Sequence, residues 1–235
     1  MIKKQALFLL ILMLTVACNV PTQEVQTEQL PTVPLAVIPS DTAVPPTPTI
    51  TPVPPFSPDV DSGNVMYDFT AQYCSAKWGN NGEFFDCPIN DLETKSGVVQ
   101  KLDDAKLEGG IPINAPTLLT IPGYDQLMGI FGRYPAYQVQ SGDHFMAHLA
   151  CLPDGGECHV EFALEYYRQD GTYVSLPFSD IELNSSNGFD LMPVDIDLSS
   201  LSDQSVDFVL VVRNIVDEPP GYPVWIYPHI TRKTP

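Results

Sequence analysis

The chain has 235 residues and a formal net charge of −18, because 29 acidic side chains outnumber 11 basic ones. The field of such a surface repels phosphate backbones, so nucleic acid is excluded as a partner. The acidic residues are scattered rather than blocked, which is typical of a soluble surface that resists association.

The N-terminus has the pattern of a secretory signal peptide. Lys3 and Lys4 form a short basic start, residues 6–14 (ALFLLILML) form an apolar run, and small residues close the segment before Cys18. The apolar run is too short to span a bilayer, and this order of residues predicts a signal peptide for export.

With a cysteine at the cleavage site, this segment resembles a bacterial lipobox. The resemblance implies cleavage after Ala17 and a diacylglycerol on the thiol of Cys18, which becomes the lipidated N-terminus. We therefore expect a palmitate-type lipid anchor in the cell membrane. The rest of the chain is expected outside the cytoplasm, on the extracellular or the periplasmic face.

Residues 18–58 are predicted to form a disordered tether that is rich in proline and threonine. Proline removes backbone donors and fixes φ, so helix and sheet are both disfavoured. A segment of this composition stays extended and could hold a domain up to ~100 Å from the membrane. It is either a tether through a surface layer or a spacer with no length requirement.

Residues 59–235 have the aromatic residues and turn-forming glycines of one folded domain. Short strand-like runs separated by turn signals predict an all-β, antiparallel two-sheet β-sandwich. The expected strands are residues 65–73, 97–101, 117–121, 127–131, 137–139, 143–167 as a hairpin, 172–176, 189–198, 205–213 and 224–230. We expect one helical turn at residues 199–204 and the final strand beside an early one.

Four cysteines remain once Cys18 carries lipid, and an even number in an exported chain predicts two disulfides. Three pairings are possible, and the close spacings favour Cys74–Cys87 and Cys151–Cys158. Zinc is the alternative, but neither spacing matches the two-residue spacing of zinc knuckles.

A bridge between Cys151 and Cys158 predicts a hairpin that turns at residues 152–157. Its register pairs apolar side chains on one face: Leu149 with Val160, Ala147 with Phe162, and Phe145 with Leu164. The opposite face pairs histidines with glutamates: His148 with Glu161, and His144 with Glu165. On a strand the two histidines stand ~13 Å apart, so they cannot share a metal ion.

The end of the chain is similar to a known group of domains. Residues 194–204 (VDIDLSSLSDQ) lead into a strand at 206–212 (VDFVLVV), and residues 225–230 read WIYPHI. This ending resembles the close of galactose-binding-like jelly rolls, among them a class named as novel carbohydrate-binding modules. The resemblance covers residues 143–232 and rests mainly on packing residues. It implies a jelly-roll sandwich and sugar binding, but residues 221–224 (GYPV) lack the acidic residue that those modules carry before the tryptophan.

Candidate ligand-binding residues come from Gly/Pro-rich segments and the chain's end. Sugars offer apolar C–H faces that stack on aromatic rings, and hydroxyls that suit polar side chains. The candidates are Trp78, Tyr124, Arg133, Tyr134, Tyr137 and Tyr222. Trp78 is favoured as an exposed platform because it lies in a glycine- and asparagine-rich stretch. A core or rim position is the alternative for each aromatic residue, and Trp225 is expected in the core.

No cofactor is expected, apart from a possible structural calcium. Asp195 and Asp197, or Asp103 and Asp104, could supply hard oxygen ligands, although no stretch has the spacing of a calcium loop.

The sequence lacks the motifs of a nucleophile elbow, a phosphate-binding loop or a zinc protease, so we expect no enzyme. The leading hypothesis is a membrane-anchored surface lipoprotein that displays a module for binding carbohydrate. One alternative is a structural or protein-interaction lipoprotein of the cell envelope, with no small ligand. A cryptic hydrolase that uses two carboxylates is the third hypothesis.

Overall fold

The computed structural model describes residues 53–59, 64–80, 83–89, 97–123, 129–176, 180–184, 191–216 and 218–233. The chain divides into two units, Met1–Thr49 and Ile50–Pro235, and every described residue belongs to the second. Cys18, the predicted signal peptide and most of the predicted tether lie outside the described residues. Within the described part, no helix is long and apolar enough to cross a membrane.

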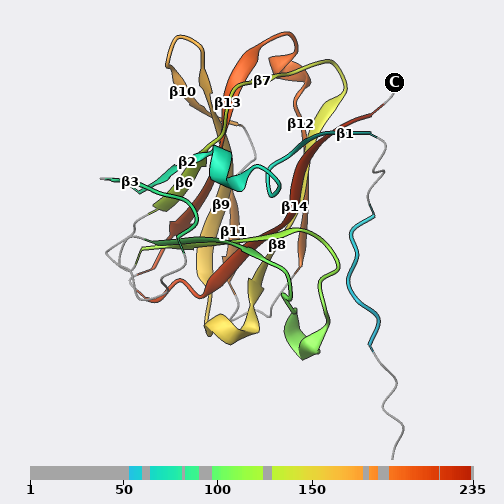
Figure 1. Cartoon of the computed structure of the whole chain (residues 1–235), viewed down its shortest axis with the longest axis vertical. Helices are drawn as coiled ribbons and strands as arrows, with labels where there is room; N and C mark the ends of the chain where they lie inside the picture. The colour runs from blue at the N-terminus through green and yellow to red at the C-terminus, as the bar shows by residue number, and fades with distance from the viewer. Residues whose placement is uncertain are drawn as a thin grey trace, which may run out of the picture. The chain divides into compact units, whose positions relative to one another are not determined.

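One of two antiparallel sheets has six strands (Figure 1). They are β1 (Val65–Asp68), β4 (Gly97–Leu102), β5 (Thr117–Pro122), β8 (Asp143–Leu152), β12 (Met192–Asp197) and β14 (Tyr222–Arg232). Their order is β12-β8-β14-β5-β4, and β1 also pairs with β14. The first and last strands therefore lie side by side, as expected.

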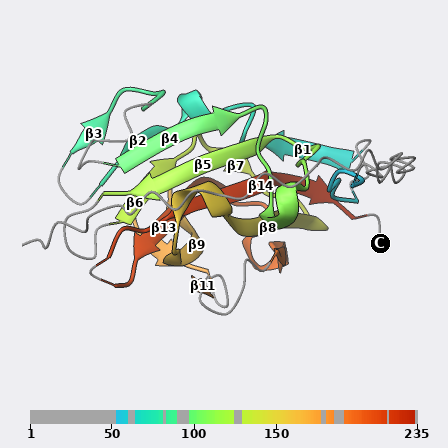
Figure 2. The same ribbon diagram turned by 90° about the horizontal axis from the view of Figure 1, so that it is seen from below.

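The other sheet has eight strands, seen with the first sheet in Figure 2. They are β2 (Lys77–Gly79), β3 (Phe84–Phe85), β6 (Gly129–Arg133), β7 (Tyr137–Gln138), β9 (His159–Arg168), β10 (Tyr173–Ser175), β11 (Ile181–Asn184) and β13 (Ser205–Asn214). The order is β10-β9-β13-β6-β2-β3; β11 also pairs with β9, and β7 with β13. Single 3₁₀ turns lie at Tyr73–Ser75, Glu108–Gly110, Pro153–Gly155 and Ser199–Leu201.

The predicted two-sheet β-sandwich is confirmed. The longer expected strands are present, and the helical turn falls at Ser199–Leu201. The strand expected over residues 65–73 stops at Asp68, where the chain turns toward Tyr73–Ser75. The sequence did not predict β2, β3 and β11, because strands of two to four residues are too short to show a clear alternation.

Alternate side chains of both sheets fill the interior. Phe145 and Leu149 come from β8, and Phe162 and Leu164 come from β9; all four are almost completely buried. Trp225 of β14 is 2% exposed, and its ring meets those of Phe145 and Phe162 edge-on, with ring centroids 6.1 and 4.9 Å apart. Its predicted core position is therefore confirmed.

Both predicted disulfides, Cys74–Cys87 and Cys151–Cys158, are present, but the hairpin built on the second one is wrong. β8 belongs to the six-stranded sheet and β9 to the eight-stranded sheet, so the Cys151–Cys158 bridge links two sheets. The apolar residues that were expected to pair share the interior from opposite sheets. Alternation identifies the buried face of a strand, and that face looks the same in a hairpin and in a crossing between sheets.

The polar pairs predicted from that hairpin are wrong for the same reason. His144 contacts Asp195 of the neighbouring β12, with Nδ1 2.7 Å from Oδ1. Glu161 and Glu165 both bind Arg213 of β13.

The outer face of the six-stranded sheet is covered by a second apolar cluster. Leu107 and Ile113 from the segment between β4 and β5 pack on Leu119 and Ile226. Phe56 packs there too: its N–H donates to the Pro112 carbonyl (2.8 Å), and its own carbonyl accepts from the N–H of Asn114 (2.8 Å).

Candidate functional site

The outer face of the eight-stranded sheet has an apolar floor. On β13, Phe208 and Leu210 point into the core, so the alternate residues Val209 and Val211 point outward. Together with Ala163 of β9 they form a separate cluster, against which Phe131 and Tyr167 pack. All three floor side chains are 4% exposed or less, so this face is covered by its own aromatic neighbours.

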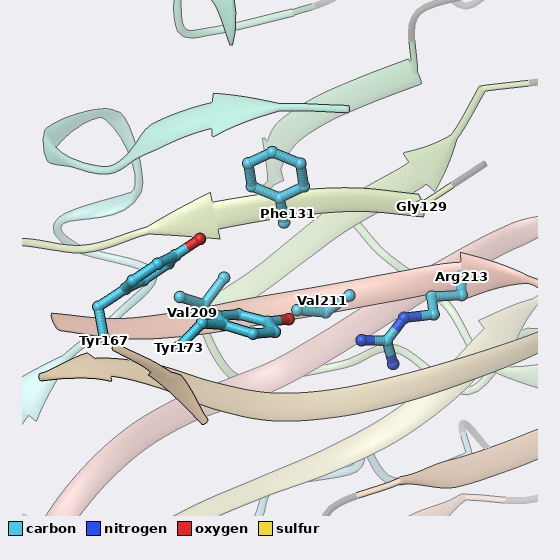
Figure 3. Close-up of a pocket in the computed structure, with 7 residues that line it drawn as sticks. All are labelled: Gly129, Phe131, Tyr167, Tyr173, Val209, Val211 and Arg213. Atoms are coloured by element: carbon cyan, nitrogen blue, oxygen red, sulfur yellow. The ribbon is translucent and has the colours of Figure 1, made fainter. Parts of the chain in front are cut away.

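A pocket of about 190 Å³ opens on this floor (Figure 3). We call it the outer groove, and it is lined by Gly129, Phe131, Tyr167, Tyr173, Val209, Val211 and Arg213. Tyr167 and Arg213 stand at opposite ends, with the two valines between them (Figure 3). Tyr173 lies directly opposite Tyr167 on β10, with ring centroids 5.0 Å apart, and is 48% exposed.

Two carboxylates hold Arg213 in place. Its Nη1 donates to Oε1 of Glu161 (2.6 Å), and its Nη2 donates to Oε1 of Glu165, whose side chain is 1% exposed. The Ser175 hydroxyl also donates to Glu165 (3.1 Å). Partial burial alone would lower the pKa of Arg213, but the hydrogen bonds with Glu165 and Glu161 outweigh it and raise that pKa. The guanidinium therefore stays charged and keeps a fixed orientation.

Arg133 lies at the Tyr167 end of the groove. Its guanidinium carbon is 4.2 Å from the centroid of the Tyr167 ring, a cation–π contact. Asp207 accepts a hydrogen bond from Nε of the same guanidinium (2.8 Å), and its Oδ2 forms an ion pair with Nη2 (2.6 Å). Beyond Arg133 is a second pocket of about 310 Å³, lined by Ser75, Lys77, Arg133, Tyr134, Pro135 and Asp207. The Arg133–Tyr167 contact therefore separates the outer groove from this second pocket.

The outer groove combines an apolar floor, the exposed ring of Tyr173, the half-buried rings of Tyr167 and Phe131, and polar groups whose positions are fixed by ion pairs. Such a site suits a ligand with flat apolar faces and a polar edge that both donates and accepts hydrogen bonds.

Trp78 is not the exposed platform that was predicted, because its side chain is completely buried. The stretch that suggested a loop contains β2, whose alternation points Trp78 inward. The indole N–H donates to the carbonyl of Tyr73 (2.6 Å). The ring covers Gly132 on β6, where an added Cβ would lie 2.6 Å from the nearest ring atom. A ring enclosed in this way cannot stack on a ligand.

Among the predicted ligand residues that the structure describes, only Arg133 borders the outer groove, through its contact with Tyr167. Tyr134 follows it in the chain and is 1% exposed, with its ring in the core. Tyr137 is half-buried and donates its hydroxyl to Asp143 (2.9 Å). Tyr222 packs against the cluster on the other sheet, and Tyr124 lies outside the described residues. The predicted set therefore does not form one site.

Two of the four carboxylates considered for calcium, Asp195 and Asp197, already have partners. Asp195 lies between His144 Nδ1 (2.7 Å) and Lys233 Nζ (2.6 Å). Partial burial would raise its pKa, but the hydrogen bonds with Lys233 and His144 lower it overall. Asp197 accepts hydrogen bonds from the backbone N–H (2.8 Å) and the hydroxyl of Ser199. Across the described residues, no group of three or more His, Cys, Asp or Glu side chains could hold a metal ion. Calcium binding there stays a prediction.

Sequence reasoning missed most of the outer groove, although one signal was present. The strand at residues 205–214 is apolar on both faces, since Val209 and Val211 alternate with core residues. Outward valines on a long strand indicate a face that is covered or hollowed rather than fully solvated. The neighbours Phe131, Tyr167 and Tyr173 could be added only once the strand order was known.

Several solved structures to which the chain is similar are carbohydrate-binding modules. One, from the β-sandwich superfamily, has 9% identity and a TM-score of 0.43, with 71% of this chain and 60% of that one covered. A family 28 module specific for non-crystalline cellulose has 13% identity, 77% and 100% coverage, and a TM-score of 0.42. The C-terminal family 22 module of Clostridium thermocellum Xyn10B has 12% identity, 74% and 96% coverage, and a TM-score of 0.39.

The chain spans less than two thirds of the first of these structures. No protein-family model and no curated protein matches the chain. With identities of 13% or less and TM-scores below 0.5, the three structural similarities indicate no ligand for this chain.

Proposed function

We propose that this chain is a lipid-anchored, non-catalytic protein that binds carbohydrate in the outer groove. The observation that supports the ligand class best is the floor of Val209 and Val211 between the Tyr167 and Tyr173 rings and Arg213. Sugar rings have apolar C–H faces that pack on aromatic rings, and their hydroxyls both donate and accept hydrogen bonds.

The polar end of the groove is already organised for such hydroxyls. Glu161, Glu165 and Arg213 hold one another in place, so a ligand would not have to order them on binding. A preorganised site loses less side-chain entropy on binding, which favours affinity. Because both glutamates accept from Arg213, neither is placed as a free general acid, which supports binding rather than glycoside hydrolysis.

Aromatic residues lie on four strands of this face, Phe131 and Phe84 in line with Val211, and Tyr167 and Tyr173 in line with Asp207, four residues away along the same strand. Tyr173, Tyr167, Phe131 and Phe84 lie on β10, β9, β6 and β3, and Phe84 meets Phe131 edge-on with ring centroids 6.2 Å apart. With neighbouring strands ~4.8 Å apart, β10 and β3 are about 24 Å apart across the sheet, so the two aromatic groups lie well beyond the length of one sugar ring. That separation suits a glycan chain better than a single sugar.

Residues 1–58 support the anchored part of the proposal. A signal peptide that ends in a lipobox-like cysteine, followed by a proline-rich spacer, is the expected layout for a domain held outside the cytoplasm. The polysaccharide would then be met in the cell envelope or outside the cell.

Affinity electrophoresis of the mature, detergent-solubilised chain through gels that contain single polysaccharides tests the proposal. We expect retardation by at least one polysaccharide, and about tenfold weaker binding for Tyr173→Ala. Met192→Ala is the matched control, because Met192 is also partly exposed (37%) but lies on β12 of the other sheet. If no polysaccharide retards the chain, or if Tyr173→Ala binds as tightly as the parent, the proposal is contradicted.

A protein ligand is the second candidate, favoured by the exposure of Phe84 (72%) on the same face. In that case Phe84→Ala would weaken capture of an envelope protein, and polysaccharide would not compete for it.

A further inference from the structure

The charged residues that line the second pocket, Lys77, Arg133 and Asp207, indicate which charge the ligand carries. We propose that Lys77 and Arg133 receive an anionic substituent of the bound glycan, a carboxylate or a sulfate, so that the ligand is an acidic polysaccharide. This inference rests on the proposed function, because the anionic group belongs to a glycan held in the outer groove.

Lys77 and Arg133 are two cations placed directly opposite each other. Lys77 on β2 pairs with Arg133 on β6, and both point to the outer face, since Trp78 and Tyr134 beside them point inward. Like charges at directly opposed positions destabilise an antiparallel strand pair. This chain has 29 acidic and 11 basic residues, so a basic pair is an unusual choice. A local rule broken without an evident structural gain is a mark of a functional site.

The charges that line the second pocket do not cancel. Asp207 pairs with Nε and Nη2 of Arg133, and in the described part of the chain it is the one carboxylate paired with this guanidinium. Lys77 is exposed, and in the described part of the chain no carboxylate oxygen lies within 4.0 Å of its ammonium. Two cations and one carboxylate therefore leave this pocket net positive.

The opposite end of the groove has the reverse balance. Arg213 lies between Glu161 and Glu165, and a carboxylate oxygen of Asp180 is 3.9 Å away from it. An anionic group would be repelled from that end and attracted to Lys77 and Arg133. The net charge of the whole chain also repels anions, but at physiological ionic strength charges beyond about 8 Å are largely screened.

The two sites adjoin, so one glycan can reach both. Arg133 lines the second pocket and lies on the ring of Tyr167, which lines the outer groove. A sugar that stacks in the groove therefore places its next unit beside Arg133. Guanidinium and ammonium groups bind carboxylates and sulfates through short charge-assisted hydrogen bonds, and Arg can present two N–H groups to one anion.

Matched pairs of neutral and acidic polysaccharides test the inference: galactan with polygalacturonate, and dextran with dextran sulfate. We expect the mature chain to bind the acidic member of at least one pair about fivefold more tightly, an effect of about 1 kcal/mol. Lys77→Gln should remove this preference without weakening binding to the neutral member. The matched control is Lys101→Gln, since Lys101 is an exposed lysine on β4 of the other sheet. High salt should abolish the preference in the parent as well.

Equal binding of both members by the parent would overturn the inference and leave carbohydrate binding intact. So would an acidic preference that survives in Lys77→Gln. Failure of the proposed function looks different, because then Tyr173→Ala would bind both members as the parent does.

Discussion

Cys151 and Cys158 are joined between the two sheets of the sandwich, with Cα atoms 6.2 Å apart. Cys151 belongs to β8 of the six-stranded sheet, and Cys158 immediately precedes β9 of the eight-stranded sheet. β9 carries Glu161, Glu165 and Tyr167, so the bridge fixes the start of a strand that shapes the outer groove.

Removing this bridge should destabilise the domain without rearranging it. A closed loop of this length contributes about 2–3 kcal/mol, mainly by restricting the unfolded chain. Urea unfolding should therefore show that loss for Cys151→Ser/Cys158→Ser, and a similar loss for Cys74→Ser/Cys87→Ser. An unchanged free energy of unfolding would contradict the bridge between the sheets.

Trp78→Ala should act on stability rather than directly on a ligand. Deleting a fully buried indole costs about 3–5 kcal/mol. Gly132→Ala should cost about 1–3 kcal/mol, because the new Cβ would overlap the Trp78 ring. Both losses are measurable by urea unfolding, with Tyr173→Ala as a nearly neutral control. A stable Trp78→Ala domain that has lost glycan binding would contradict this assignment.

Acid should weaken the fold through His148 and His229. Burial lowers the pKa of His229; burial and the charge of His229 lower the pKa of His148. The unfolded chain takes up these protons below about pH 6.5, and the folded chain only at lower pH. The stability that depends on the neutral histidines is therefore complete above pH 6.5 and is lost as the pH falls.

The comparison of the parent with His148→Gln isolates this effect. Urea unfolding at pH 7 and pH 5.5 should show a smaller loss for the variant than for the parent. The carboxyl of Asp195, whose pKa is lowered, keeps its full contribution above about pH 4 and loses it only at lower pH, so it does not disturb this window. Identical losses for the two chains would contradict the role of His148.

Phe56 should stabilise the domain although it lies before the predicted boundary at residue 59. Its half-buried ring packs on the six-stranded sheet, 5.2 Å from the His148 ring between centroids. Phe56→Ala should lower the free energy of unfolding by about 1–2 kcal/mol. Val53→Ala is the control, because Val53 is 53% exposed. A chain that begins at residue 59 should show at least this loss, because it also lacks the two backbone hydrogen bonds of Phe56. No loss in either would contradict the docking of Phe56.

Cys18→Ala should release the protein from the membrane. If the thiol of Cys18 carries diacylglycerol, the native chain fractionates with membranes and the variant does not. Mass spectrometry of the N-terminal peptide checks the modification directly. An unmodified Cys18 in the native chain would contradict the anchor, but it would leave glycan binding by the domain untouched.

The sequence predicted which face of each strand is buried better than it predicted which strands lie side by side. Alternation at Phe145, Leu149, Phe162 and Leu164 identified the buried side of β8 and β9, because one face of each strand is apolar. It could not tell that these strands belong to different sheets, since a connection that crosses between sheets leaves the same alternation. Strand order is set by packing between segments that are distant in the chain.

Most of the candidate site could not be predicted either, because it depends on the order of the strands. Arg133 was recognised, but Tyr167 and Tyr173 reach the groove only because β9 lies beside both β10 and β13. Trp78 was misjudged because neighbouring glycines and asparagines are typical of loops. In the structure the three residues Lys77–Gly79 form a strand, and its middle residue, Trp78, points into the interior.

Methyl NMR of the chain titrated with an oligosaccharide from the retarding polysaccharide tests the central claim most directly. We predict that the methyl signals of Val209 and Val211, which form the floor of the outer groove, shift with the glycan. Leu119 is the internal reference, because it is buried on the outer face of the six-stranded sheet. Shifts confined to Leu119 and its neighbours, with Val209 and Val211 unchanged at saturating glycan, would contradict binding in the outer groove.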